Sequence, residues 1–266
     1  MQGFLEILRG EELITYEVIP IKTNLIKPNA DFFKIFNDSL SANHIELKNH
    51  DILIIAESVL ATMQGRIIDL DTIKPSQKAL QLAKEHDMDP RYVQVIIDES
   101  DKIYGGVKNV LLCKKEGNLL ANAGIDQSNA PINHVVLLPN LNKIDNIRKK
   151  LETTYSIKIG LIIADSRTQP LRKGVIGLAL AISGFEPVES FIGRKDLYGK
   201  ELKYTYRAIA DDLVSAAQIE LGESNESVPF VIVRGVKVKF TDTPEMSMFM
   251  EEDECLYMNV FKKSLE

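Results

Sequence analysis

The sequence predicts a mixed fold of helices and strands, and α+β describes it better than a regular α/β series. Five short apolar runs have the length and composition of β-strands, and helix-like stretches with clear ends lie between some of them. They do not alternate regularly, as a βαβ series requires. The strand-like runs are Glu17 to Ile21, Ile52 to Ala56, Val107 to Cys113, Ile157 to Ala164 and Pro229 to Val233.

Three helices are predicted from residues that typically begin or end a helix. A serine can cap the first helix, an Asp-Pro pair opens the second, and a glycine in the C′ position ends the third. These helices run from Ser76 to about His86, from Asp89-Pro90 through Ile97, and from Arg207 to Leu221 before Gly222.

The segment from Val107 to Ile125 predicts a hairpin that turns at Glu116-Gly117-Asn118, because apolar runs flank this turn-forming trio. Asp126 then follows the second strand. The nearest approach to a linker, 222–228, is too short to separate independent domains. We therefore expect residues 1–266 to form one unit of two packed lobes, roughly 1–100 with 200–266 and 101–199.

Composition excludes several classes of protein. The 266 residues are 45% apolar and carry a formal net charge of -6, without the basic stripe that nucleic-acid binding requires. The most apolar window, Val175 to Phe185, is too short to cross a bilayer, and the N-terminus is acidic where a signal peptide is basic. Cys113 and Cys255 form no metal or disulfide motif. We expect a cytoplasmic protein that binds neither nucleic acid nor membranes.

Common catalytic motifs are absent from the sequence. The string from Gly193 to Lys200 has the wrong spacing for a P-loop, and there is no dinucleotide fingerprint, zinc-binding histidine pair or nucleophile elbow. The four histidines stand apart in polar contexts and are better explained as surface residues.

Two loops combine side chains that could carry chemistry. In Ala121 to Asn129, a strand is followed by the carboxylate of Asp126, although an Asx turn would explain the same residues. In Ile159 to Arg172, a buried strand delivers Asp165 and Ser166 before two arginines. Carboxylate, hydroxyl and arginine together suit Mg²⁺ or Mn²⁺ with phosphate. The alternative is a strand-terminal aspartate that pairs with a nearby arginine.

A third feature is Glu223, which lies just past the C-terminus of the predicted helix that ends at Leu221. A carboxylate is unfavourable at this end of the helix dipole, so a metal ion could account for it. A solvated loop glutamate is the more common explanation.

The motif GRKDLYGKEL, Gly193 to Leu202, together with ANAGIDQSN and the strand that ends in Asp165, resembles the coenzyme F-420 γ-glutamyl ligase family. The similarity covers about Val18 to Gly235, and its ordered motifs make a chance match improbable. Further matches are QGR at Gln64 to Arg66, LRKGVIGLALAISG from Leu171, Ala210-Asp211 and VIVRG ending at Gly235.

This resemblance implies a GTP-dependent ligase that adds L-glutamate to the lactyl carboxylate of des-glutamyl F-420 through an acyl phosphate, and then a second, γ-linked glutamate. It also implies an intertwined homodimer of two-lobed subunits. Each subunit would hold two divalent ions, Mg²⁺ or Mn²⁺, with K⁺ as a possible additional ion.

The same resemblance assigns roles to individual residues. Asp126 and Asp165 would bind one metal and act in catalysis, Ser166 and Glu223 would bind the other, and Asn129 would contact the nucleotide. Further nucleotide-site residues are Thr23, Asn24, Leu25, Glu57, Ser58 and Thr62, and candidates for substrate or phosphate contact are Arg172, Arg194 and Lys195.

The sequence departs from the family pattern on the nucleotide and acceptor side. Thr62 stands where relatives usually have a lysine, and Glu57-Ser58 replaces a Ser-Thr pair. Loss of a cation and gain of a carboxylate weaken triphosphate binding unless something compensates. Two alternatives therefore stay open: a ligase or phosphotransferase for another small carboxylic acid, and a non-catalytic relative that binds a deazaflavin or nucleotide.

The C-terminal segment, Thr241 to Glu266, contains Met246, Met248, Phe249 and Met250 near an acidic run. Methionine-rich faces adapt to many partners, so this tail could be a helix that packs on a second subunit. An ordinary surface helix is the other interpretation.

Overall fold

A five-stranded mixed sheet forms the centre of the protein, in a computed structural model that describes residues 15–264. The strand order is β1-β12-β2-β8-β9, and β2 with β8 is its one parallel pair. This order explains why the chain shows no regular βαβ repeat. The bounds are β1 Glu17–Ile21, β2 Ile52–Ala56, β8 Gly160–Thr168, β9 Val175–Ser183 and β12 Phe230–Arg234.

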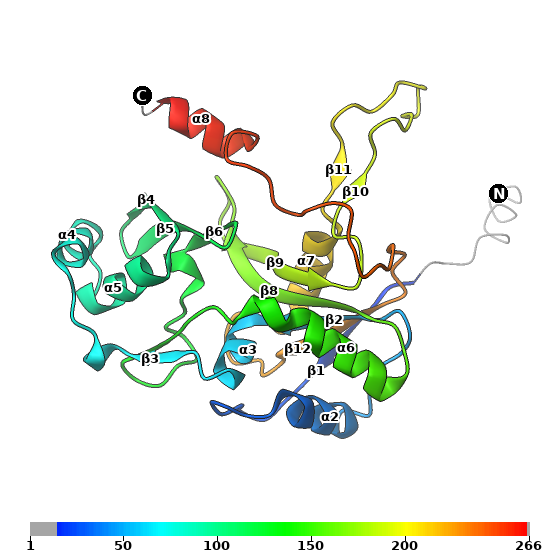
Figure 1. The fold of residues 1–266 in the computed structure, drawn as a ribbon, viewed down its shortest axis with the longest axis horizontal. Helices are drawn as coiled ribbons and strands as arrows, with labels where there is room; N and C mark the ends of the chain where they lie inside the picture. The colour runs from blue at the N-terminus through cyan, green and yellow to red at the C-terminus, as the bar shows by residue number, and fades with distance from the viewer. Residues whose placement is uncertain (1–14, 265–266) are drawn as a thin grey trace, which may run out of the picture.

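Helices cover both faces of this sheet (Figure 1). Successive strand residues point to opposite faces, so Leu53 and Ile55 of β2 join one core while Ile52 and Ile54 join the other. The first core is completed by α2 (Phe32–Ala42), α3 (Glu57–Met63) and α6 (Ile144–Tyr155), and the second by α7 (Ile209–Leu221).

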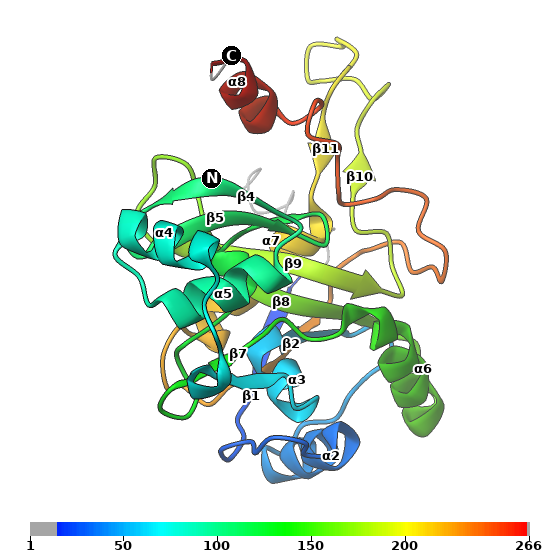
Figure 2. The same cartoon turned by 60° about the vertical axis from the view of Figure 1, so that its left-hand side comes forward.

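A second body lies at one end of the sheet, as Figure 2 shows from another side. Its core is built around the fully buried Val93, Leu111 and Val135. It consists of β3 (Ile67–Asp69), η1 (Leu70–Thr72), α4 (Gln77–His86), α5 (Pro90–Glu99), β4 (Lys102–Val107), β5 (Val110–Lys115), β6 (Asn118–Ala121), η2 (Asn122–Gly124) and β7 (His134–Val136), and η3 (Leu141–Lys143) leads back to α6.

Two projections rise from the same side of the molecule (Figure 1). One is the arm, residues 189–207, whose base is the short pair β10 (Glu189–Ser190) and β11 (Tyr206–Arg207). The other is the C-terminal tail, residues 236–264, which ends in α8 (Leu256–Ser264).

Most of the predicted elements are confirmed. The strands β1 and β2 have the predicted bounds, and Ser76 and Asp89 cap α4 and α5 as expected. The hairpin turns at Glu116-Gly117, and Gly222 ends α7. Within residues 15–264, no helix is long and apolar enough to span a membrane. The two cysteines are free thiols.

Several element boundaries differ from the prediction; β8, for example, begins at Gly160 and not at Ile157. Val107 ends β4 and does not begin the hairpin, because Asn109 adopts a positive φ of 66° and makes an additional turn. The strand expected to end at Ala164 continues to Thr168, since pairing with β9 is independent of side-chain polarity. Arg207 pairs in β11, so α7 starts at Ile209.

The central sheet draws strands from both segments that were assigned to separate lobes. β1, β2 and β12 come from 1–100 and 200–266, whereas β8 and β9 come from 101–199. The proposed lobe boundaries therefore do not follow the sheet.

Candidate metal and nucleotide site

Two carboxylates leave the central sheet side by side. The parallel strands β2 and β8 are in register at Ala56 and Ala164, and Glu57 and Asp165 follow these two residues directly. Neighbouring strands lie about 4.8 Å apart, so the sheet itself brings the two acids together. Glu57 is buried, with 9% of its surface exposed.

Asp126 reaches this pair from the second body. Its backbone forms a two-way bridge with Val136, at 2.9 and 2.8 Å, and the buried hydroxyl of Tyr92 donates to the carbonyl of Ile125 at 2.7 Å. The Asp126 carboxylate accepts hydrogen bonds from the N–H and the hydroxyl of Ser128, both at 2.7 Å. The Asx turn considered from the sequence is therefore present, and it fixes the direction of this carboxylate.

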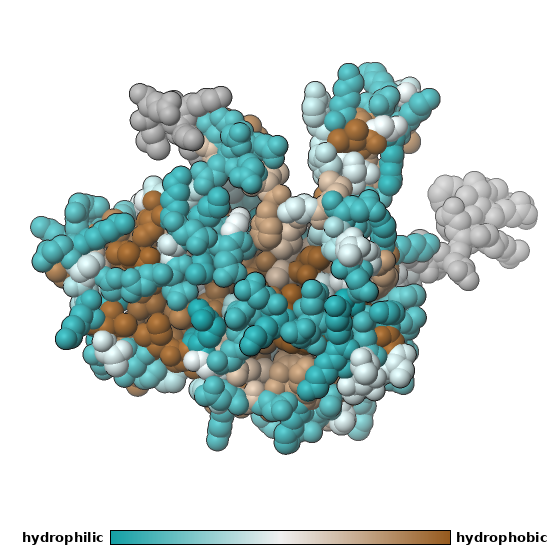
Figure 3. Space-filling view, in the orientation of Figure 1, coloured by the Kyte–Doolittle hydropathy of each residue, from teal (hydrophilic) through white to brown (hydrophobic). Residues whose placement is uncertain are grey.

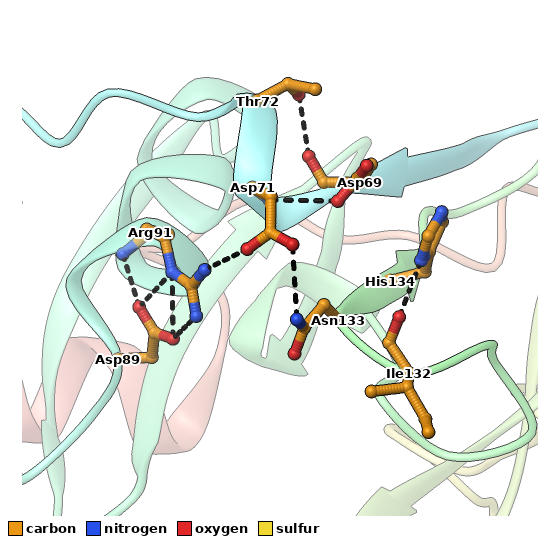
Figure 4. A network of polar contacts seen from close by, with 8 residues as sticks. All are labelled: Asp69, Asp71, Thr72, Asp89, Arg91, Ile132, Asn133 and His134. Carbon is orange, nitrogen blue, oxygen red and sulfur yellow. Dashed lines mark hydrogen bonds and ion pairs between the residues drawn. The ribbon is translucent and has the colours of Figure 1, made fainter.

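A polar network anchors the loop that follows Asp126 (Figure 4). Arg91 of α5 forms ion pairs with Asp71 and Asp89, and the Asn133 side chain donates to Asp71 at 3.2 Å. His134 then pairs with Asp69 in the register of β3 and β7. Both ends of the loop that carries Asp126 and Asn129 are thereby tied to the second body.

Glu223 approaches from the end of α7. The Gln218 side-chain amide donates to one oxygen of its carboxylate, and the hydroxyl of Ser166 donates to the other at 3.4 Å. The Asn129 amide donates to the carbonyl of Ser224 at 3.3 Å. Three segments that are far apart in the sequence therefore meet around Ser166.

Burial and neighbouring carboxylates raise the pKa values of Glu57 and Asp165. Burial and the charges of Asp165 and Asp126 raise the pKa of Glu57 well above its usual range. Burial, together with Asp126 and Glu223, raises the pKa of Asp165 to about 7. Mutual repulsion of this kind is typical of functional sites and is relieved by a cation.

The donor atoms fit hard divalent cations. Carboxylate and hydroxyl oxygens are the ligands that Mg²⁺ and Mn²⁺ prefer, and these ions keep positions for phosphate and water. Among residues 15–264, no three acidic, histidine or cysteine side chains are grouped so as to hold one ion.

The other candidate residues divide between this site and more distant elements. Ser58 bonds to Glu57, and Thr62 lies on the same helix, where its carbonyl accepts from Asn29 and Gly65. The N–H of Thr23 donates to the carbonyl of Ser227, in the loop that begins with Glu223, at 2.9 Å. Asn24 and Leu25 are exposed beside it.

The arginines and the lysine lie elsewhere. Arg172 is exposed in the loop between β8 and β9. Arg194 and Lys195 belong to the arm. Arg194 forms an ion pair with Glu189 at 2.7 Å, and Lys195 forms an isolated backbone β-bridge with Glu201. The alternative of an arginine that pairs with the strand-borne aspartate is not observed among residues 15–264; Arg167 instead approaches Asp211, at 3.7 Å.

Comparison with known proteins identifies the family. The model of the family described as "F420-0:Gamma-glutamyl ligase" matches residues 20–235. The chain belongs to this gamma-glutamyl ligase family. It is 38% identical to the coenzyme F420:L-glutamate ligase of Methanocaldococcus jannaschii over 80% of this chain and 86% of that protein. It is 37% identical to the enzyme of that name from Methanococcus maripaludis strain C7, over 92% and 98%. The chain is thus a ligase that forms carbon–nitrogen bonds.

In this gamma-glutamyl ligase, the role predicted for one residue of the site was incomplete, and two further residues were not found from the sequence. Glu57 was assigned to the nucleotide alone, whereas the structure also makes it a neighbour of Asp165. The sequence contained a signal for Glu57, because this residue directly follows a buried strand, just as Asp165 follows Ala164. Gln218 and Tyr92, which hold Glu223 and the Asp126 loop, gave no such signal.

Proposed function

We propose that this ligase joins L-glutamate to the lactyl carboxylate of des-glutamyl coenzyme F-420, with GTP as the phosphoryl donor. Membership of the gamma-glutamyl ligase family supports the acceptor and the amino acid. Glu57 and Asp165 lie where two parallel strands leave the sheet, and Asp126 reaches them from the second body. This cluster supports phosphoryl transfer, which needs concentrated negative charge to bind the cations of a triphosphate.

The reaction proceeds in two balanced steps. A carboxylate oxygen of the acceptor attacks the γ-phosphorus of GTP, the bond to the β-phosphate oxygen breaks, and GDP leaves with that electron pair. The α-amine of glutamate then attacks the acyl carbon, inorganic phosphate leaves, and the nitrogen loses a proton. A second cycle on the new γ-carboxylate gives the γ-linked diglutamate. Water must be excluded in between, because hydrolysis would destroy the acyl phosphate.

The described residues divide this work. Asp126 and Asp165 would hold one divalent ion, and Ser166 and Glu223 another, either Mg²⁺ or Mn²⁺; these ions would neutralise the triphosphate. Asn129 and the Thr23 to Leu25 segment lie along the loop after α7 and would orient the nucleotide. K⁺ is proposed only as an additional ion that the assay should include.

The active assembly is proposed to be a homodimer. The arm exposes Leu197, Tyr198 and Tyr204 almost completely, and Figure 3 shows apolar surface on this projection. Large apolar side chains on an isolated hairpin are typical of an interface with another chain. Light scattering should give twice the mass of the 29.9 kDa chain, and Leu197→Asp should reduce the measured mass to that of a single chain.

The decisive experiment is product analysis. Purified protein is incubated with des-glutamyl F-420, glutamate, Mn²⁺ and K⁺, with GTP or ATP in separate reactions, and products are measured by mass spectrometry. Gains of one and two glutamyl units with GTP support the proposal. An inactive Asp126→Asn and an unaffected Asp38→Asn, an exposed control, would tie the activity to the cluster. Ligation of a different acid instead would replace the proposed acceptor.

A further inference from the structure

An apolar recess lies beside the outer edge of β9, between the sheet and the C-terminal tail. Leu180 and Ile182 of β9 form its floor, Leu141 of η3 forms one side, and Met246, Met248 and Phe249 of the tail form the other. We call it the tail recess. Figure 3 shows apolar surface in the hollow between the α8 projection and the arm.

The tail is anchored on both sides of this recess. Before it, Thr241 donates to the carbonyl of Gly184 at 3.0 Å, so the tail starts against the chain that directly follows β9. Beyond it, the Glu252 carboxylate accepts from the hydroxyl of Tyr104 at 2.6 Å and from Lys102 at 3.2 Å, both on β4. The methionine-rich segment is therefore held across the space between the sheet and the second body, and the recess lies beneath it.

The lining suits a flat heteroaromatic ring. Methionine thioethers make favourable contacts with aromatic rings and adapt to their outline. In the part of the chain that the structure describes, β9 is one of the two edge strands of the central sheet, and an edge presents backbone N–H and C=O groups without a strand partner. A ring that has apolar faces and a rim of hydrogen-bonding groups could use both features.

The tail recess also reaches the carboxylate side of the sheet, through Leu180. Leu178 of β9 is directly opposite Asp165, and paired residues point to the same face. Leu178 and Leu180 belong to the same core, so the floor of the recess continues from this position. Ile182, which packs with the core on the other face, is four residues beyond Leu178, or about 13 Å at 3.3 Å per residue.

We propose that the tail recess binds the deazaflavin ring of the acceptor while the lactyl carboxylate lies at the carboxylate cluster. The proposal rests on the proposed function, because it takes its ligand from that reaction. In the acceptor, a ribityl, phosphate and lactyl chain separates the ring from the reacting carboxylate, and this chain, when extended, is long enough for the separation along β9. The tail is thereby part of the substrate site.

The test uses the deazaflavin riboside, which has the ring and ribityl chain without phosphate or lactate, as a fluorescent probe of the full-length protein. Met246→Ala and Phe249→Ala should each weaken its binding by about tenfold, because each removes a wall of the recess. Met250→Ala is the matched control, since Met250 is 65% exposed and outside the recess. Thermal unfolding and GTP binding should be unchanged in all three.

The outcomes separate this proposal from the proposed function. If both recess substitutions weaken riboside binding, the result supports ring binding in the tail recess, even if the protein ligates a different acid. Unchanged riboside affinity in the two recess variants overturns the recess, and normal glutamate ligation in the same variants would leave the proposed function intact. Failure of the unaltered protein to bind the riboside also overturns the recess.

Discussion

Asp165→Asn should stabilise the metal-free protein while it abolishes activity. Asp165 has its pKa raised to about 7 from an ordinary value of 3.8. Because the folded pKa is the higher one, the unfolded chain loses this proton near pH 4, whereas the folded chain keeps it until about pH 7. The stability that the fold gains from holding this proton is therefore complete below pH 4 and is lost as the pH rises through 7.

The size of the effect follows from the shift. One pKa unit corresponds to about 1.4 kcal/mol, so the charged carboxylate costs the metal-free fold up to about 4 kcal/mol above pH 7. Asparagine carries no charge and should recover about 2 to 4 kcal/mol there. Glu57 adds to the gain, because its own pKa is raised partly by Asp165.

Urea unfolding with a chelator at pH 6 and pH 8.5 measures this prediction. The variant should exceed the unaltered protein at pH 8.5 and differ less at pH 6, and added Mn²⁺ should stabilise the unaltered protein more than the variant. Asp38→Asn, which changes an exposed acid paired with Lys34, is the control. Equal stabilities at pH 8.5 in the chelator would refute the view that unneutralised charge is concentrated at Asp165.

Two further substitutions test the supports of the site and the tail. Arg148→Met should lower the free energy of unfolding by about 3 to 5 kcal/mol, since it removes a buried partner of the buried Glu152. Arg148 is 2% exposed and pairs with Glu152 and with the more exposed Asp242, and an unchanged urea midpoint would contradict this. Tyr92→Phe removes the buried hydrogen bond to Ile125, so it should cost about 1 to 2 kcal/mol and weaken Mn²⁺ binding in calorimetry. Wild-type Mn²⁺ affinity would show that Tyr92 does not position Asp126.

Local features of the fold could be predicted from the sequence because their causes are local. The apolar run of β2 predicts its bounds, and the side chains of Ser76 and Asp89 accept hydrogen bonds from the first turns of their helices wherever those helices pack. The turn at Asn109 was missed, because a single residue with positive φ gives little signal between two strands.

The neighbours in the sheet could not be predicted in the same way. Pairing of β2 with β8 joins residues more than 100 positions apart, and no local pattern encodes that register. Asp165 was found because its strand and its motif are both visible in the sequence. Glu57 was assigned only to the nucleotide, because its proximity to Asp165 depends on which two strands are adjacent.

The position of Glu57 also changes the interpretation of the departures from the family pattern. A serine at this position would leave the triphosphate with one negative charge fewer beside it, and a lysine at position 62 would add a positive charge. Thr62 is one helical turn beyond Ser58, so both face the same side of α3. This chain instead adds a buried carboxylate next to Asp165. In the proposed reaction that carboxylate, when ionised, would attract divalent ions more strongly and would repel GTP in their absence.

We therefore expect GTP binding to depend unusually strongly on the metal. Glu57→Ser with Thr62→Lys should weaken Mn²⁺ binding to the nucleotide-free protein, because one carboxylate leaves the cluster. The same pair should allow GTP to bind at lower Mn²⁺ concentrations, because repulsion is replaced by attraction. Calorimetric titration of GTP at several Mn²⁺ concentrations measures both effects, with Thr62→Ser as the uncharged control. If the double variant bound GTP with the unaltered metal dependence, Glu57 would not act on the nucleotide, and the metals alone would set the charge of the site.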